Sequence, residues 1–274
     1  MKGSIENMKK IKNYILSKEF IITLLIIAFM VFINIKYPEQ LGFALPKYKD
    51  GFAFWKSGLL GNFNDYLVVI LPMLFAFCST KKFFYELSGS ALKDTILRED
   101  YHKYLKKNIF LTALKAVIPL YIVSTILLTF GIVKYGVVLA KCNGSITCLG
   151  MRGIITNPFL YVILTYLLWY LFALIYLNIV YIFFYIIKKY YVALLASYIS
   201  FIVLDFALQA ISAFISMAFD NGRMRFIYDL IYGLTPNENI LSCLFIIGSF
   251  LIISFIVVKI IYKDKEKVVI NFEG

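Results

Sequence analysis

Histidine is almost absent from this chain of 274 residues, which contains a single one, His102. The apolar stretches therefore contain no histidine that could form a Ser-His or Cys-His catalytic pair or bind a metal ion. The sequence also lacks the H-E-x-x-H, C-x-x-C and G-x-x-x-x-G-K-[ST] motifs. We therefore expect no metal site, no enzymatic activity and no ATP hydrolysis by this chain alone.

Charge is also scarce, since 16% of the residues are charged and 61% are hydrophobic. A soluble domain of this length does not need so much apolar surface, because water must wet its outside, whereas a bundle that faces lipid has no such demand. A helix crosses the bilayer core in about 20 apolar residues. The sequence therefore predicts an all-α polytopic membrane protein, a single domain over 1–274, with six transmembrane helices at 20–36, 65–80, 110–133, 159–187, 190–218 and 240–262.

The basic residues predict an orientation. If the amino terminus lies in the cytoplasm, the cytoplasmic segments carry 18 of the 28 Lys and Arg residues and the outer segments carry nine. Cytoplasmic loops are enriched in Lys and Arg, so we expect both termini to be cytoplasmic. The net charge of +12 is thus mainly a topology signal, and no nucleic-acid partner is expected. The richness in Lys, Ile and Tyr suggests a bacterial cell membrane.

The amino-terminal segment 1–19 is basic and amphipathic. Apolar residues at helical spacing alternate with Lys9, Lys10 and Lys12, a pattern typical of a helix that lies on the inner membrane surface. Two interpretations remain open, a basic anchor that fixes topology and a specific docking element.

Two features of the outer loops are notable. The segment 51–60 is apolar enough to dip into the membrane as a re-entrant or surface helix. Cys142 and Cys148 flank an Asn143-Gly144 turn dipeptide on the side away from the reducing cytosol, so we expect a disulfide between them.

The inner loop 81–109, between the second and third predicted spans, is long, charged and periodic. Leu97, Tyr101, Tyr104 and Leu105 fall on one helical face, and charged residues occupy the other. This pattern predicts an amphipathic helix at the inner interface that runs into the third span. A soluble partner that pushes on such an element would move the span that follows it.

The residues of this loop also resemble those of a known protein family. Glu86, Gly89, Lys93 and Arg98, followed by a span, resemble the first cytoplasmic loop of ABC-2-type transporter permeases. The amphipathic amino-terminal segment, the Thr235-Pro236 step before the last span and six spans with cytoplasmic termini are similar to the same family.

The resemblance implies a function and a set of partners. Permeases of this family work as homodimers or heterodimers with two cytoplasmic ATPase subunits, which bind ATP and Mg, while the permease itself binds no cofactor. By position, the resemblance gives Glu86, Gly89, Lys93 and Arg98 the role of a coupling helix that contacts the ATPase. It also implies export of a hydrophobic or amphipathic substrate, such as a peptide, toxin, antibiotic or lipid, by alternating access.

Polar residues at membrane depth are costly and tend to face the protein interior or a water-filled path. Asp205 lies well inside the fifth span, and Gln209 follows one helical turn later on the same face. Asn178 and Lys115 are possible partners. A structural hydrogen bond between helices and a substrate contact explain Asp205 equally well, so Asp205, Gln209 and Asn178 form a candidate translocation path. An alternative function is an ATPase-independent secondary carrier with Asp205 as its proton or ion site, or a membrane assembly factor.

Overall fold

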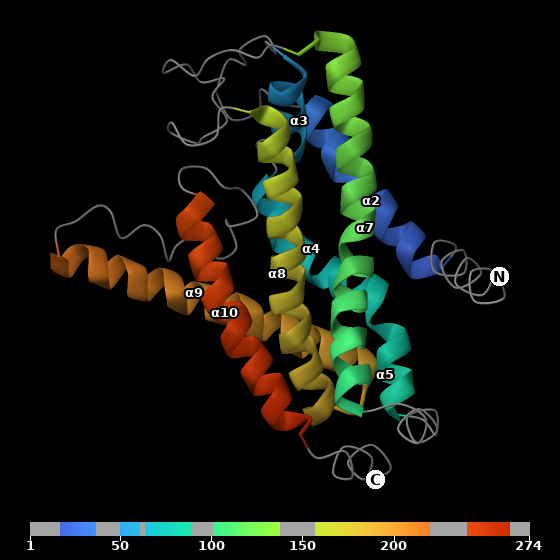
Figure 1. The fold of residues 1–274 in the computed structure, drawn as a ribbon, viewed down its shortest axis with the longest axis vertical. Coiled ribbons are helices and arrows are strands. Elements are labelled where there is room, and N and C mark those ends of the chain that lie inside the picture. The colour runs from blue at the N-terminus through green and yellow to red at the C-terminus, as the bar shows by residue number, and fades with distance from the viewer. Residues whose placement is uncertain are drawn as a thin grey trace.

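The computed structural model describes residues 17–36, 50–60, 64–88, 101–137, 157–219 and 240–263. Within these ranges the chain is almost entirely helical (Figure 1). The helices are, in chain order, α2 (Lys18–Lys36), α3 (Gly51–Leu60), α4 (Asn64–Ser79), α5 (Lys81–Ser88), α7 (Tyr101–Tyr135), α8 (Pro158–Ile186), α9 (Tyr190–Phe219) and α10 (Ile240–Ile261).

Each of the six apolar stretches recognised in the sequence lies in a helix. Five of the six helices begin and end within two residues of the predicted bounds. The exception is α7, which begins at Tyr101 instead of residue 110 and spans 35 residues, because the amphipathic segment before the span continues into it as one helix. By length and composition, four helical segments of the described chain can cross a membrane: Lys18–Lys36, Lys103–Tyr135, Pro158–Ile186 and Tyr190–Ala207.

Helix α8 occupies the centre of the fold. From Phe172 to Leu177 each of its side chains is buried, whichever side of the helix it lies on. A helix that is apolar all round is expected to be surrounded by protein or lipid. Here the surrounding elements are α4, α7, α9 and α10, all of which contact α8.

The other helices are arranged around α8. Helix α7 runs beside α8 along the long axis, and α10 packs obliquely on the lower half of α8 (Figure 1). Helices α2, α3 and α4 all contact α7. Helix α9 starts at the base of the bundle, and its carboxyl-terminal half projects away from the other helices (Figure 1).

The outer surface of the bundle is strongly apolar. Leu25 and Phe29 of α2, Ile126 of α7, Phe206 of α9 and Ile260 of α10 are each more than 60% exposed. Soluble monomers rarely present large apolar patches to water, so such a surface fits contact with lipid. Together with the four long apolar helices, this surface defines the class of the molecule, a helical membrane protein.

Candidate functional site

The helices that flank residues 89–100 meet at one end of the bundle, which we call the inner end because the sequence predicts that it faces the cytoplasm. The Tyr104 phenol of α7 donates a hydrogen bond of 2.7 Å to the Glu86 carboxylate of α5, and Asn108 donates to the Tyr104 oxygen at 3.2 Å. Lys82, one turn before Glu86, forms an ion pair with it at 3.3 Å. Glu86 therefore connects α5 to the first turns of α7.

A second ion pair fixes α2 to the same region. The Lys81 ammonium at the start of α5 donates to the Glu19 carboxylate in the first turn of α2. This hydrogen bond raises the pKa of Lys81 above its ordinary value. The ion pair therefore connects α2 to the joint between α4 and α5.

Aromatic rings hold α5 against the inner ends of α8 and α9. Phe83 meets Tyr181 edge-on with ring centroids 4.5 Å apart, and Phe84 meets Phe184 in the same way at 5.0 Å. Tyr190, the first residue of α9, packs on Phe84 at 5.4 Å. Aromatic pairs in these geometries contribute about 0.5–1.5 kcal/mol beyond the burial of their area. Helix α5 is thus an integral part of the bundle.

The structure confirms the amphipathic pattern of the predicted inner loop where that loop is described. At the start of α7, Leu105 is buried and Tyr104 is half-buried, while Lys103, Lys106 and Lys107 are exposed. Of the predicted coupling residues, Glu86 lies at the junction above. The remaining three, Gly89, Lys93 and Arg98, lie outside the described residues, as do the segment 1–16 and both cysteines of the expected disulfide, Cys142 and Cys148.

Helix α3 packs closely against the outer half of α7. Gly51 donates its backbone N–H to the Gly136 carbonyl at 3.0 Å, and a Cβ on Gly51 would lie 2.5 Å from the Ile132 nitrogen. One turn later, the fully buried Trp55 donates its indole N–H to the Ser124 hydroxyl at 2.8 Å. The sequence predicted a surface or re-entrant helix here, and the structure shows a helix whose apolar face is buried inside the bundle.

A polar stripe lies between α7 and α8, which we call the hydroxyl stripe: Tyr121, Thr125 and Thr129 of α7 with Tyr166 and Tyr170 of α8. The Thr125 and Tyr166 hydroxyls are 3.0 Å apart, and Tyr166 also donates to Ser124 at 3.0 Å. The Tyr121 and Tyr166 rings stack with centroids 4.7 Å apart. All five side chains are at least partly exposed, although they belong to helical segments that are long and apolar enough to cross a membrane.

Sequence reasoning missed the hydroxyl stripe. The signal was present, because Tyr121, Thr125 and Thr129 recur every four residues and Tyr166 and Tyr170 repeat the same spacing. Hydroxyl-bearing residues inside apolar helices usually bond to their own backbone or pack between helices, so this periodicity alone did not single them out. Thr129 does bond its own helix, at the Thr125 carbonyl.

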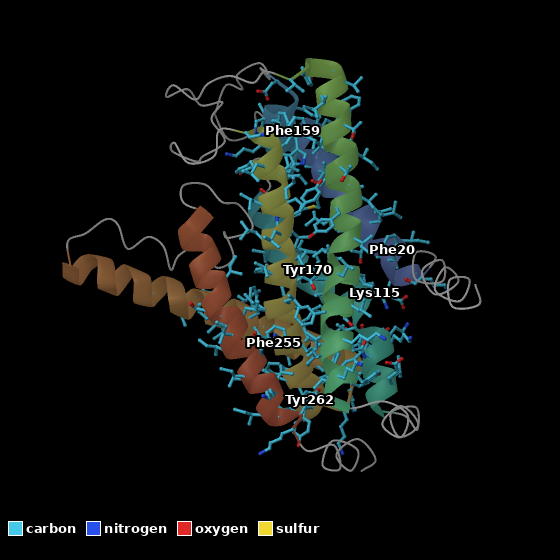
Figure 2. All side chains as sticks on the ribbon, in the orientation of Figure 1. Phe20, Lys115, Phe159, Tyr170, Phe255 and Tyr262 are labelled. Carbon is cyan, nitrogen blue, oxygen red and sulfur yellow. The ribbon has the colours of Figure 1, made fainter. Side chains whose placement is uncertain are left out.

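The residues predicted to line a translocation path occupy different parts of the fold. Asn178 is fully buried in α8 and donates to the Ser254 hydroxyl of α10 at 2.9 Å. Asp205 is 6% exposed and lies in α9, one turn beyond Phe201, whose ring meets Phe172 of α8. Lys115 lies in the inner half of α7 (Figure 2). Asn178 therefore connects α8 to α10, and Gln209 belongs to the part of α9 whose side chains the structure does not describe.

Comparisons of the chain with protein-family models, with curated proteins and with solved structures return no match. The class of the molecule therefore rests on its own composition and helices.

Proposed function

We propose that this chain is the membrane-spanning subunit of an ATP-driven ABC transporter, a permease with six transmembrane helices and both termini in the cytoplasm. The six proposed spans are the four long apolar helices together with α4, which has 16 residues, and α10, which has 22 residues. Helix α5 follows α4 after one residue and lengthens it at the inner end. The excess of basic residues in the inner segments supports this orientation.

One observation carries the proposal, the mechanical connection between α5 and α7. Residues 89–100 join these two helices, and the hydrogen bond from Tyr104 to Glu86 holds the helices together on either side of the connection. Helix α7 then continues without interruption to Tyr135. A force applied to residues 89–100 would therefore reach the outer half of the bundle through α7 and the second span through α5.

The hydroxyl stripe supports a transport role. Exposed polar side chains at membrane depth are costly in lipid, so they tend to face a partner helix or a polar path. The stripe offers aromatic faces and neutral hydroxyls, a combination suited to hydrophobic or amphipathic molecules such as peptides, toxins, antibiotics or lipids. We place the contact with substrate, or with a second permease, on this face.

The proposed complex contains two copies of a cytoplasmic ATPase and a second permease, identical or different, in a bacterial cell membrane. The ATPases bind ATP and Mg²⁺, and their closure on ATP pushes on residues 89–100. The motion passes through α5 and α7 and opens the interface between the permeases to the outside, which exports the substrate by alternating access.

The test is affinity purification of the chain from its native membrane, followed by mass spectrometry and an ATPase assay of the complex. We expect a near-equimolar ATPase that carries a phosphate loop. Arg98→Glu should release this ATPase or abolish coupled hydrolysis, while Lys188→Glu, an equal charge change in another predicted inner segment, should not. A partner-free chain without ATP hydrolysis would rule out the proposal.

A second candidate function rests on the burial of Asp205, which is 6% exposed and belongs to the mainly apolar helix α9. Intramembrane carboxylates commonly serve as proton or ion sites. Under this alternative the chain is a secondary carrier that needs no ATPase. Asp205→Asn would then abolish proton-coupled flux in proteoliposomes, whereas under the first proposal it would only change the rate of ATP-driven transport.

A further inference from the structure

A cavity of about 630 Å³ lies between the first turns of α7 and the last turns of α10. Its walls are mainly apolar and include Ile109 and Phe110 of α7 with Phe255 and Val258 of α10. We call it the inner slot. Its volume falls within the range of about 300–1,000 Å³ that is typical of ligand pockets.

The packing of the bundle explains why the inner slot exists. Helix α10 packs extensively on α8, and α7 also packs on α8, but α7 and α10 share few direct contacts. One direct contact between them is the stacked pair of Phe110 and Phe255, whose ring centroids are 5.6 Å apart. Below this pair the two helices leave a space that opens on the surface, where Ile256 is 52% exposed.

Two lysines stand at the inner end of the slot. Lys106 lies one turn before Phe110 in α7, and Lys259 lies one turn after Phe255 in α10. Helices α7 and α10 run in opposite directions (Figure 1), so these spacings place both lysines at the same end of the slot, on the same side of the stacked rings. Both side chains are exposed, and neither forms a salt bridge within the described chain.

The remaining polar group of the slot is already satisfied. Tyr262, at the lower end of α10 (Figure 2), donates its phenol O–H to the Tyr181 carbonyl of α8 at 2.7 Å. A ligand in the inner slot therefore contacts apolar walls along its length and two positive charges at one end. This combination complements one kind of molecule at membrane depth, an acyl chain that ends in an anionic head group.

We propose that the inner slot binds an anionic phospholipid of the leaflet at this end of the bundle. The acyl chain lies between α7 and α10 against Phe110 and Phe255, and the phosphate lies between Lys106 and Lys259. Basic pockets between transmembrane helices are suited to anionic head groups. By bridging α7 and α10 where the helices themselves do not, the lipid stabilises the inner end of the bundle.

The experiment uses the purified full-length chain and native mass spectrometry, with phosphatidylglycerol and phosphatidylcholine as probes. The double variant K106Q/K259Q removes both charges, and K107Q/K188Q is its matched control, because both of those lysines are exposed and neither lines the slot. A basic residue near an anionic membrane surface contributes about 1 kcal/mol, so loss of both should weaken phosphatidylglycerol binding by about thirtyfold. Phosphatidylcholine binding should change little.

A second variant tests the acyl chain separately from the charge. Ile256→Trp fills the slot from its exposed rim and should reduce the binding of both lipids, whereas K106Q/K259Q reduces only that of phosphatidylglycerol. Thermal unfolding in detergent should show that added phosphatidylglycerol raises the Tm of the wild-type chain more than that of either variant. The proposal would be overturned if the wild-type chain bound the two lipids with equal affinity. It would also be overturned if K106Q/K259Q and its control lost phosphatidylglycerol binding equally. Binding of inorganic phosphate alone with the same affinity would overturn the acyl-chain component.

Discussion

The Tyr104 phenol donates a 2.7 Å hydrogen bond to the Glu86 carboxylate, and this contact joins α5 to α7, the two helices that flank residues 89–100. Glu86 is also paired with Lys82, so its carboxylate has a partner on each side. Glu86 was expected from the family resemblance to contact an ATPase. In the structure its carboxylate connects α5 to α7. Under the proposed function, this connection would pass motion of residues 89–100 to both helices.

The variant Tyr104→Phe tests this connection. It removes the hydrogen bond but keeps the ring, and a partly exposed hydrogen bond to a charged group contributes about 1–2 kcal/mol to stability. We expect a small loss of thermal stability and a larger loss of coupled ATP hydrolysis in the purified complex. Tyr198→Phe is the control, since it removes a half-buried phenol from α9, away from the junction. Full coupling in Tyr104→Phe would show that the hydrogen bond does not transmit motion.

The packing of α3 on α7 predicts a strong effect of a single methyl group. A Cβ at Gly51 would lie 2.5 Å from the Ile132 nitrogen and 2.6 Å from the Gly131 carbonyl carbon. Backbone atoms cannot rotate away, so Gly51→Ala must displace α3 and should cost about 1–3 kcal/mol of stability. Gly248→Ala is a matched control, because a Cβ there meets no atom within 4 Å. Thermal unfolding in detergent measures both variants, and equal Tm values would contradict the close approach of the two helices.

The hydrogen bond between Asn178 and Ser254 predicts a pairwise coupling between α8 and α10. Interhelical hydrogen bonds in membrane proteins contribute about 0.6 kcal/mol on average. A double-mutant cycle of Asn178→Ala and Ser254→Ala, followed by unfolding in detergent, should give a coupling free energy of this size. If Asn178 instead contacts the substrate, Asn178→Ala will change substrate selectivity, and the unfolding free energies of the two variants will be additive.

The hydroxyl stripe predicts a transport defect without a folding defect. Thr125→Val keeps the shape of an exposed side chain and removes its contact with the Tyr166 hydroxyl. We expect membrane insertion and Tm to stay unchanged, while transport by cells or proteoliposomes falls several-fold. Ile126→Leu, on the adjacent and strongly exposed position, should leave transport intact. Unchanged transport in Thr125→Val would remove this face from the proposed path.

The helices themselves could be predicted from sequence because apolar length and the positions of charges determine where a chain can lie in lipid. The ends of α4, α8 and α10 follow these signals closely. The start of α7 confirms the prediction that an amphipathic helix runs into the third span, because the basic side chains at 103–107 extend from one face of a continuous helix. The number of spans remains a prediction for α4 and α10.

The candidate sites depended more on tertiary contacts. Composition identified Asp205 and Asn178 as polar residues at depth, but only the fold shows that Asn178 bonds to α10. Likewise, the periodicity of Tyr121 and Thr125 gives no indication that Tyr166 of α8 lies beside them. Contacts between distant segments depend on how whole helix faces pack, and that information is distributed over many residues.

By itself, the sequence determined that this protein is helical and lies in a membrane, because apolar runs of such length leave the backbone no other way to satisfy its hydrogen bonds. It also determined the amphipathic start of α7 through the periodicity of its charges. Only the tertiary structure decided that α8 is the central helix, that Glu86 joins α5 to α7, and that the inner slot lies between α7 and α10. The reason is physical, since nearly every helix here is apolar on all sides and its burial depends on its neighbours rather than on its own pattern.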